Sequence, residues 1–439
     1  MRPFTNFEDA QAYLLGTIDE FASPRTSYTL DRMRAFLRNL GDPHRVYPTI
    51  HVGGTSGKGS TSTMIAAALQ AAGRRTGLHT KPHLVSMTER ARIDGVPIDR
   101  ERFARLLNES MPAIERTTAE YGRPTYYETL LALAFAYFAA ERIDVAVIEV
   151  GLGGRLDGTN VITPVVAAIT SIGYDHEEIL GATIEAIALE KAGIAKAGVP
   201  LVVGNVPEAA RAVIERRAAE VGAPVVLVRD VVEIGVEKSD LHGTLLHLKT
   251  AEDVYALDLP VLGIFQRSNA ATAIAVLERL GTRLRPHREA ILRGFASLTI
   301  PGRMELVASK PPVVFDIAHN IEKAEALVAS LRESFAGRRV HYVVSIGESK
   351  DARRILEVLS KLPSSFIFTS YSTAGRRSIP ASRLSTIAES FGNWGRAISD
   401  PVEALTIARR VAAIDDVVVV TGSTFIVAGL REWFVAASV

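Results

Sequence analysis

The sequence predicts an α/β protein of two domains, each built around a mostly parallel sheet. Short runs of β-branched and other apolar residues alternate with Ala-rich helical stretches along the whole chain. The runs are continuous rather than alternating, as expected for parallel strands that are covered on both faces. At 439 residues the chain is also too long for one ordinary domain, so a second domain is expected.

The expected elements follow one another from Thr49 to Thr421. Strands are predicted at Thr49–Val52, Val145–Val150, Val165–Thr170, Leu201–Val203, Val313–Phe315, His341–Ile346, Phe366–Thr369 and Val417–Thr421. Helices between them include Ser60–Ala72, Glu128–Arg142 and Ala324–Phe335. The turn-rich segment Val225–Leu259 is expected to add an antiparallel edge to the first domain. A domain boundary is expected near residue 298, which gives domains 1–298 and 299–439.

Composition excludes several classes of protein. Lys and Arg number 50 against 49 Asp and Glu, so bulk charge gives no reason to expect a nucleic-acid partner. The absence of cysteine excludes disulfides, thiolate catalysis and Cys-ligated zinc, and it fits a cytoplasmic protein. The N-terminus does not resemble a secretory signal, and apolar segments such as Leu130–Ala140 are too short to span a bilayer. No membrane partner is therefore expected.

A phosphate-binding loop is the first strong functional signal. An apolar strand enters a Gly-rich turn, which is followed by a lysine and by hydroxyls that open an amphipathic helix: Val52-Gly53-Gly54-Thr55-Ser56-Gly57-Lys58-Gly59-Ser60-Thr61. Glycines let backbone N–H groups converge on phosphate oxygens, and the helix N-terminus adds partial positive charge. Lys58 is expected at the terminal phosphates, and Ser60 or Thr61 at Mg²⁺. Nucleotide binding alone leaves many functions open.

Two further polar residues follow the ends of expected strands. Glu149 ends one buried run and His176 lies just past the end of the next. Ligands bind at the carboxyl ends of parallel strands, and carboxylate oxygen suits Mg²⁺. Either residue alone would more often be a plain loop residue, but both beside a phosphate loop predict a metal site. Lys191, taken by composition alone, is an ordinary surface lysine of a helix.

Together these segments resemble the Mur ligase superfamily, and specifically the dihydrofolate synthase/folylpolyglutamate synthase family. The resemblance runs from about residue 28 to the C-terminus. Besides the loop, its markers are Pro82-His83-Leu84 with Glu89-Arg90, Tyr127-Glu128-Thr129, Glu149 through Asn160, Gly173 through His176, Glu190 through Ile194, Gln266 with Asn269, Pro301-Gly302-Arg303, Asp316 with Ala318-His319-Asn320, and Thr421-Gly422-Ser423.

The resemblance implies an architecture and a reaction. Residues 1–298 would form a Mur-ligase-like P-loop ATPase domain that binds ATP and the pterin, and 299–439 a smaller Rossmann-like α/β domain that binds glutamate. ATP would phosphorylate an acceptor carboxylate, and the amine of L-glutamate would attack the acyl phosphate, releasing phosphate and leaving ADP. The acceptors implied are dihydropteroate, (tetrahydro)folyl-glutamates or both, which places the enzyme in folate biosynthesis and one-carbon metabolism. The cofactors implied are ATP and Mg²⁺, as one ion or two, in a monomer.

The resemblance also assigns roles to individual residues. Catalytic roles fall to Lys58, His176, Arg303 and Lys191, the lysine that is carbamylated in this family. Mg²⁺ contacts are implied for Ser60, Glu149, His176 and the Lys191 carbamate, whose oxygens, unlike an ammonium, suit a cation. ATP contacts are implied for Gly57, Lys58, Gly59, Ser60, Thr61, Asn269, Arg303 and Asp316. Contacts to the acceptor or glutamate are implied for Tyr127, Glu128, Arg155, Asp157, His319 and Asn320.

Some positions depart from the family pattern. Lys81 stands where the family has a serine that contributes to a Mg²⁺ site, and Ser27-Tyr28-Thr29-Leu30-Asp31 only loosely matches the pterin-binding segment. Two alternatives therefore stay open beside the main prediction. One is a Mur-type amide ligase for another carboxylate, and the other is a non-catalytic nucleotide-binding regulator of the same fold. The Glu149, His176, Lys191 and Lys58 set argues against the regulator.

Overall fold

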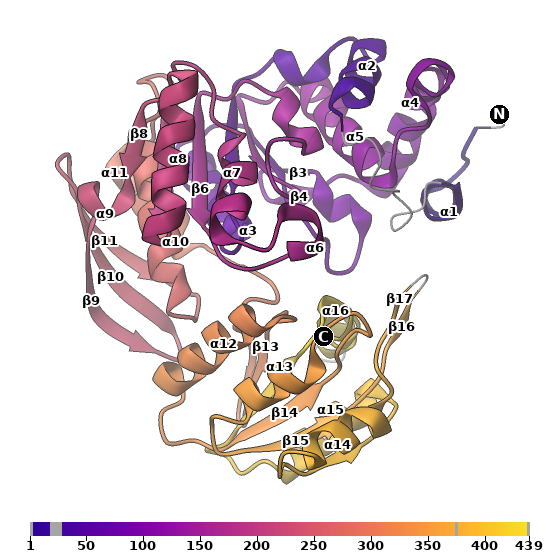
Figure 1. The fold of residues 1–439 in the computed structure, drawn as a ribbon, viewed down its shortest axis with the longest axis vertical. Helices are drawn as coiled ribbons and strands as arrows, with labels where there is room; N and C mark the ends of the chain where they lie inside the picture. Colours follow the sequence, from indigo (N-terminus) through magenta and orange to yellow (C-terminus); the bar gives the residue numbers. More distant parts are fainter. Residues whose placement is uncertain (1–2, 18–28, 374–375, 437–439) are drawn as a thin grey trace. The chain divides into compact units, whose positions relative to one another are not determined.

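The computed structural model describes residues 3–17, 29–373 and 376–436. The described chain divides into two compact units. The first comprises Met1–Ile234, Leu248–Ala256 and Ser268–Ser297, and the second comprises Gly235–His247, Leu257–Arg267 and Leu298–Val439. Both units are α/β, as the sequence predicts (Figure 1).

The first unit is built on an eight-stranded sheet of order β4-β3-β2-β5-β1-β6-β7-β8. Six strands are parallel, and β3 and β4 add a short antiparallel edge. Every residue of the central strands β1 and β5 is buried, which is why these segments are continuously apolar. The bounds are β1 Thr49–Gly53, β2 Thr76–His79, β3 Arg92–Ile93, β4 Val96–Pro97, β5 Val145–Glu149, β6 Val166–Ser171, β7 Leu201–Asn205 and β8 Val225–Leu227.

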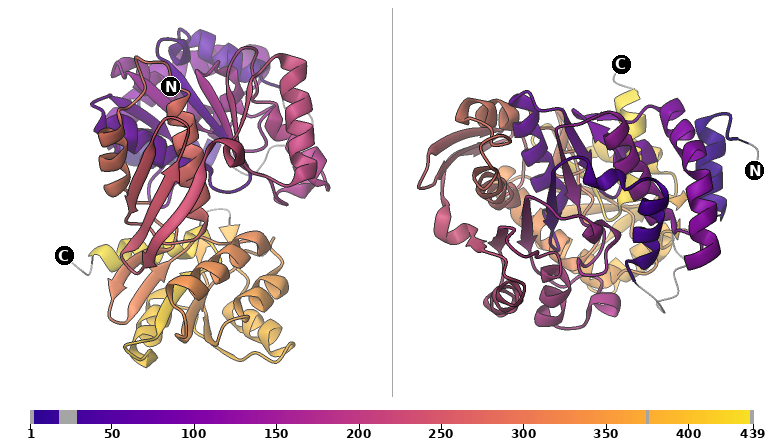
Figure 2. Two further views of the ribbon diagram at one scale, coloured as in Figure 1. Left: turned by 90° about the vertical axis from the view of Figure 1, so that its left-hand side faces the viewer. Right: turned by 90° about the horizontal axis from the view of Figure 1, so that it is seen from above.

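Helices cover both faces of this sheet (Figures 1 and 2). One apolar core joins α1, α2, α4 and α5 to β5, and another joins α7 and α8 to β6 and β7. Capping residues set where the helices begin, as at α5, where Thr125 and Glu128 form a reciprocal capping box. The helices are α1 Phe7–Thr17, α2 Asp31–Asn39, α3 Lys58–Ala71, α4 Arg100–Tyr121, α5 Tyr126–Ala140, α6 Glu177–Leu180, α7 Ile184–Ala192, α8 Glu208–Val221, α9 Val228–Val231, α10 Phe265–Glu278 and α11 Arg288–Ala296.

The segment Val225–Leu259 differs from its prediction. Only β8 joins the large sheet, in parallel, while β9 (Glu233–Asp240), β10 (Gly243–Lys249) and β11 (Val254–Leu259) form a separate three-stranded sheet. The antiparallel edge expected on the first domain is therefore wrong. Exposed and buried residues alternate strictly along β11, so one face of this small sheet is covered and the other faces solvent. Such a half-covered antiparallel sheet can form separately from the large parallel sheet.

The second unit contains a six-stranded sheet of order β12-β13-β19-β14-β15-β18. β12 is an antiparallel edge and the other five strands are parallel, which confirms the Rossmann-like prediction. Strand β19, with four consecutive valines, is buried at every residue in the middle of the sheet. The bounds are β12 Glu305–Ser309, β13 Pro312–Phe315, β14 Val340–Val344, β15 Ser364–Phe368, β18 Gly395–Ala397 and β19 Val417–Thr421.

Five helices and a small hairpin complete this unit. The hairpin pairs β16 (Ser372–Thr373) with β17 (Arg376–Arg377). The helices are α12 Ile321–Ser334, α13 Ala352–Leu359, α14 Ala381–Glu389, α15 Pro401–Val411 and α16 Thr424–Ala436. Across the described parts of both units, no helix is long and apolar enough to cross a membrane.

Candidate active site

The Gly-rich loop lies between β1 and α3 and can be built only from glycine at two positions. Gly54 and Gly57 have φ of +134° and +83°. A Cβ on Gly54 would lie 2.2 Å from Thr170 Oγ1, and one on Gly57 would lie 2.3 Å from Asn269 Oδ1. Thr170 Oγ1 also lies within hydrogen-bonding distance of the Gly53 and Ser56 carbonyl oxygens, at 3.1 and 2.6 Å. The fold thus brings Asn269, predicted to contact ATP, directly against the loop.

Two lysines converge on this loop. Lys58 Nζ donates to the carbonyl oxygens of Gly54 and Thr55 at 2.8 and 3.0 Å. Lys191, only 4% exposed, donates from Nζ to the same Gly54 oxygen at 3.0 Å. Two lysine side chains therefore meet at the loop, where the phosphate oxygens of a nucleotide would be stabilised. Lys191 is therefore buried at the loop and is not a surface lysine.

Buried hydroxyls surround the start of α3. Ser60 and Thr61 are 3% and 0% exposed. Thr61 Oγ1 and the loop's Ser56 Oγ are buried without a hydrogen-bond partner among the described residues. Buried hydroxyls normally find partners, so these two mark a place where a polar ligand fits. Together with Gly57, Lys58 and Gly59, they form one cradle for an anion at the helix N-terminus.

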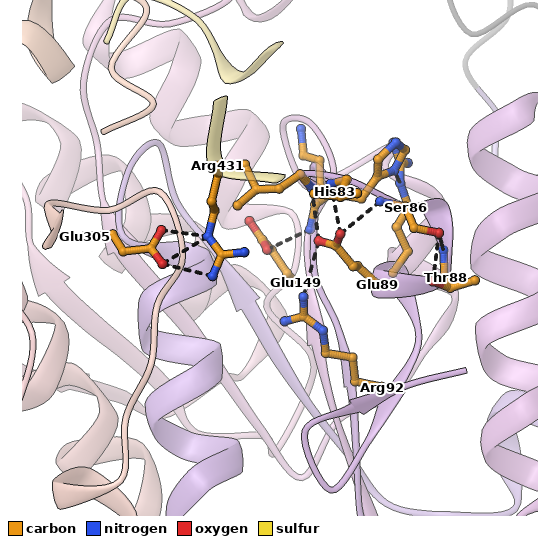
Figure 3. Close-up of polar contacts among 12 residues, drawn as sticks. His83, Ser86, Thr88, Glu89, Arg92, Glu149, Glu305 and Arg431 are labelled. Carbon is orange, nitrogen blue, oxygen red and sulfur yellow. Dashed lines mark hydrogen bonds and ion pairs between the residues drawn. The ribbon is translucent and has the colours of Figure 1, made fainter. Parts of the chain in front are cut away.

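Glu149 lies beside this cradle, at the carboxyl end of β5. The residue is 3% exposed, and its Oε2 accepts from the backbone N–H of Lys81 at 3.0 Å (Figure 3). A Cβ on Gly59 would lie only 3.3 Å from that oxygen, so the carboxylate faces the first turn of α3, which carries Ser60. A carboxylate with a nearby hydroxyl fits Mg²⁺, which takes few protein ligands beside phosphate oxygens and water. No group of three or more His, Asp or Glu in the described ranges could hold a metal by itself.

His176 stands on a neighbouring loop that is tied to the phosphate loop. Gly173 exchanges two hydrogen bonds with Thr55: its carbonyl accepts from Oγ1 at 3.2 Å and its N–H donates to Oγ1 at 3.1 Å. His176 itself has a φ of +53° at the start of α6. Its ring nitrogens lie 3.8 Å from the Asp175 carboxylate and 3.7 Å from that of Glu178. Acidic neighbours favour a cation at this position.

Asp157 is the centre of a hydrogen-bond network on the loop that follows Glu149. Its Oδ1 accepts from Tyr127 OH at 3.1 Å and from Thr159 N and Oγ1 at 3.0 and 2.5 Å, and its Oδ2 accepts from Leu152 N at 2.7 Å. Burial raises the pKa of Tyr127 well above its ordinary value, so this phenol stays protonated and donates. The predicted acceptor residues Tyr127 and Asp157 therefore lie together, with the carboxylate held in one orientation.

The same network extends to a buried histidine in the strand before the phosphate loop. His51 Nε2 lies 2.9 Å from Thr159 Oγ1. An ionised carboxylate only accepts, so the Thr159 hydroxyl donates to Asp157 and must accept from His51 Nε2–H. Burial lowers the pKa of His51 to about 3, which keeps the ring neutral. Neither His51 nor Thr159 is predicted as a site residue from the sequence, where the one signal is a histidine inside the buried strand Thr49–Gly53.

Glu128 and Arg155, also predicted at the acceptor, are engaged in ion pairs. Glu128 Oε2 accepts from Arg32 Nε and from Thr125 N, both at 2.8 Å, and the side chain caps α5. Arg155 donates to Glu190 Oε1 from Nη2 at 2.7 Å, and its side chain is 52% exposed. Of the N-terminal pterin segment, Ser27 and Tyr28 lie outside the described residues.

The Pro82–Arg92 loop, a marker of the resemblance, is held by its own side chains (Figure 3). Glu89 accepts from the backbone N–H groups of Leu84, Val85 and Ser86, at distances between 2.9 and 3.0 Å. Arg90 Nε donates to His83 Nδ1 at 2.9 Å, which leaves the His83 proton on Nε2. Burial, with help from Arg90, lowers the pKa of His83 to about 4, so the ring is neutral.

In the second unit, Asp316 directly follows β13 and holds the turn that carries Arg303. Its Oδ2 accepts from Met304 N at 2.9 Å and its Oδ1 from Ala318 N at 2.8 Å. Burial raises the pKa of Asp316, and the nearby Arg303 guanidinium opposes that shift. Asp316 thus binds the turn that carries Arg303, and both residues are predicted to contact ATP.

His319 and Asn320 follow Asp316 at the N-terminus of α12. Asn320 Oδ1 accepts from Lys323 N at 2.9 Å and caps the helix, while its Nδ2 is buried without a partner among the described residues. His319 Nδ1 lies 2.8 Å from the Ile317 carbonyl, so it carries the proton, and Nε2 accepts from Lys323 Nζ at 3.2 Å. An unsatisfied amide donor beside a lysine at a helix N-terminus suits a carboxylate.

Comparisons with known proteins show which family the chain resembles along its length. Residues 52–277 match the Mur ligase middle domain, and residues 302–424 match the Mur ligase glutamate ligase domain. The dihydrofolate synthase/folylpolyglutamate synthase of Bacillus subtilis is 35% identical over 98% of this chain and 99% of its own length. Escherichia coli FolC in complex with DHPP and ADP superposes with a TM-score of 0.88 at 31% identity, covering 100% of both chains. The Yersinia pestis bifunctional enzyme complexed with AMPPNP and Mn ion gives 0.85 at 31%, again over 100% of both chains.

The matched domains and the fold are those of a Mur-type ligase, so the protein is an enzyme of the ligase class. Within that class, the chain belongs to the dihydrofolate synthase/folylpolyglutamate synthase family.

Proposed function

We propose that this ligase joins L-glutamate to dihydropteroate, to (tetrahydro)folyl-glutamates or to both, with conversion of ATP to ADP and phosphate. The observation that carries the proposal is the convergence of Lys58 and Lys191 on the Gly54 carbonyl, with the Glu149 carboxylate beside the same turn of α3. A carboxylate oxygen is a poor leaving group, so an amide forms readily only after phosphorylation of the acceptor. A site that gathers phosphate-binding groups beside a cation ligand suits that step.

The loop residues would hold ATP. The backbone N–H groups of Gly57 and Gly59 would contact phosphate oxygens, Lys58 would face the terminal phosphates, and the hydroxyls of Ser60 and Thr61 would supply further contacts. Ser60, Glu149 and His176 would hold Mg²⁺, which when bound neutralises phosphate charge. Carbamylation of Lys191 would convert one of two crowded ammonium groups into an anion that accepts hydrogen bonds and faces the cation.

The acceptor would lie against the Asp157 loop. Four hydrogen-bond donors fix the orientation of the Asp157 carboxylate. This carboxylate would accept a hydrogen bond from an N–H of the pterin ring, with Tyr127 beside it. Glu128 and Arg155 would contribute through the ion pairs they already make, with Arg155 the more exposed of the two. Lys81, whose backbone N–H donates to Glu149, would place a cation where the acceptor's carboxylate is activated.

The second unit would supply groups for the nucleotide and the amino acid. Arg303, and Asp316 that binds the turn carrying it, would contact ATP. His319 and Asn320 would contact the incoming glutamate or the acyl phosphate, using the donor on Asn320 that is left without a partner. We further propose a cytoplasmic monomer whose partners are small molecules, with no nucleic-acid or membrane partner.

The test is phosphate release with Mg²⁺-ATP and L-glutamate, comparing dihydropteroate with tetrahydrofolate and measuring product mass in the same tubes. Acceptor-dependent release with mass rising by glutamyl units is expected. Release with one acceptor only would assign one of the two family activities. No release with either would overturn the folate proposal, and a Mur-type ligase for another carboxylate, which the Lys81 departure favours, would replace it.

A further inference from the structure

An ion pair in the second unit joins helix α16 to strand β12. Arg431 on α16 binds both carboxylate oxygens of Glu305 at the start of β12: Nε donates to Oε1 and Oε2 at 3.0 and 2.9 Å, and Nη2 lies 2.9 Å from Oε1 (Figure 3). The side chains are only 25% and 15% exposed. A forked, half-buried pair of this kind fixes orientation as well as charge. None of the roles proposed above uses either residue.

Glu305 also holds the turn that carries Arg303. Its Oε2 accepts from the backbone N–H of Gly302 at 2.8 Å. On the other side of Arg303, Met304 N donates to Asp316 Oδ2 at 2.9 Å. Gly302 O in turn accepts from Ile317 N at 3.0 Å. The residues before and after Arg303 are therefore each fixed by a carboxylate, one of which is held by Arg431.

The turn that carries Arg303 has an unfavourable backbone conformation, which other contacts must hold in place. Gly302 has φ of +66° and Met304 has φ of +48°, a left-handed conformation that is costly for a residue with a side chain. Met304 is 1% exposed, so burial of its side chain and the Asp316 hydrogen bond keep it there. If the Glu305 contact is lost, the turn can relax, and Arg303 moves with it.

We propose that Glu305 and Arg431 are positioning residues that set the direction of the Arg303 guanidinium. The inference rests on the proposed role of Arg303 at the phosphates. Arg431 holds the Glu305 carboxylate, the carboxylate holds Gly302, and Gly302 with Met304 sets the backbone of Arg303. Both residues act through Arg303 and touch no substrate.

The test measures steady-state turnover of Arg431→Ala and Glu305→Gln at a temperature where circular dichroism shows each variant folded. Because misplacing a charged group by about 1 Å costs up to about 10²-fold, kcat should fall about 10- to 100-fold, with the KM for the pterin acceptor unchanged. Arg431→Lys, which keeps the charge but has one donor nitrogen in place of two, should recover part of the loss. If Arg431→Ala does not fold, Glu305→Gln provides the same comparison, including in the Arg303→Ala background.

A double-mutant cycle separates positioning from general damage. In an Arg303→Ala background, adding Arg431→Ala should lower kcat by less than about twofold, because coupled residues are not additive. Independent, multiplicative losses would overturn the inference, as would an unchanged kcat in Arg431→Ala. Asp416→Asn is the control, since it removes the charge of another carboxylate of this unit, the one 2.8 Å from His341 at the amino ends of β14 and β19, and should leave kcat unchanged. Wild-type kcat in Arg303→Ala would overturn the inference while leaving the wild-type ligase activity, and so the proposed function, intact.

Discussion

At the scale of single residues, Lys58 and Lys191 donate to the same carbonyl oxygen, so two cationic side chains lie close together at the phosphate loop. A carbamate on Lys191 would replace one of these cations by an anion. We predict that Lys191→Ala abolishes turnover, and that short-chain carboxylates such as acetate restore part of it by supplying the missing anion. Phosphate release measured with acetate, and with chloride at equal ionic strength, checks this. Full activity in the variant, or equal rescue by chloride, would show that Lys191 has no such role.

His51 gives a second prediction at this scale, because it reaches the acceptor loop only through Thr159. His51→Leu removes the donor, and the freed Thr159 no longer holds Asp157 in one orientation, so the acceptor KM should rise about 10-fold, the cost of a lost buried hydrogen bond of about 1–2 kcal/mol. His51→Gln, whose amide can replace Nε2–H, should recover most of the loss. The KM for ATP should stay constant in both.

The matched control is His44→Gln. His44 is also a buried histidine with a ring nitrogen that lacks a partner among the described residues, but it lies in the turn Pro43–Arg45, against Phe135. Acceptor KM should be unchanged there. If His44→Gln and His51→Leu raise the acceptor KM equally, the effect reports general loosening of the unit instead of the hydrogen-bond chain.

At the scale of elements, the phosphate loop depends on glycine for space as well as for backbone angle. We predict that Gly57→Ala raises the dissociation constant for ATP at least about 10-fold, because its Cβ would collide with Asn269 Oδ1 and displace the loop. Gly73→Ala separates the two causes: Gly73 has a similar φ of +78°, but nothing lies within 4 Å of its Cβ. Calorimetric titration with ATP should show a normal dissociation constant for Gly73→Ala. Equal weakening in both variants would mean that backbone angle alone is responsible.

The elements themselves were largely predictable from the sequence. Strand Val417–Thr421 is found at its predicted bounds, and the helix predicted at Ser60–Ala72 spans Lys58–Ala71, because buried parallel strands and amphipathic helices have local signatures. The separate sheet β9–β11 was not predictable as such, since sheet membership depends on long-range pairing. The same limit applies to the site. The loop and the residues at strand ends can be recognised from local sequence patterns. The hydrogen bonds from His51 to Thr159 and from Arg431 to Glu305 join residues about a hundred positions apart, so no local pattern predicts them.

At the scale of the whole molecule, buried neutral histidines should make stability depend on pH. Burial lowers the pKa of His51 to about 3 and those of His79 and His83 to about 4, from an ordinary 6.5. Below pH 6.5 the unfolded chain binds these protons and the folded chain does not, so the free energy of unfolding decreases as pH falls from about 6.5 toward 4. Each group contributes about 1.4 kcal/mol per pH unit. Above pH 6.5 the three contribute no slope.

Urea denaturation midpoints at pH 7.5, 6.5 and 5.5 measure this dependence. The midpoint should be nearly constant between the first two and lower at pH 5.5. His79→Asn, which keeps a donor for the Arg90 carbonyl that Nδ1 now contacts at 2.7 Å, should flatten the slope between pH 6.5 and 5.5. A slope identical to that of the wild type would show that His79 is not a buried neutral group.

The division of the chain into units also bears on how the protein can be made and cut. The second unit takes two segments, Gly235–His247 and Leu257–Arg267, from the middle of a stretch that otherwise belongs to the first. During translation, these segments leave the ribosome well before the rest of their unit. They cannot pack against that unit until some thirty residues of the first unit and then the C-terminal sheet have been synthesised. A chain truncated at residue 298 would keep Gly235–His247 and Leu257–Arg267 but lack the rest of the unit to which they belong. Fragments of this enzyme are therefore better designed by joining its segments than by cutting the chain once.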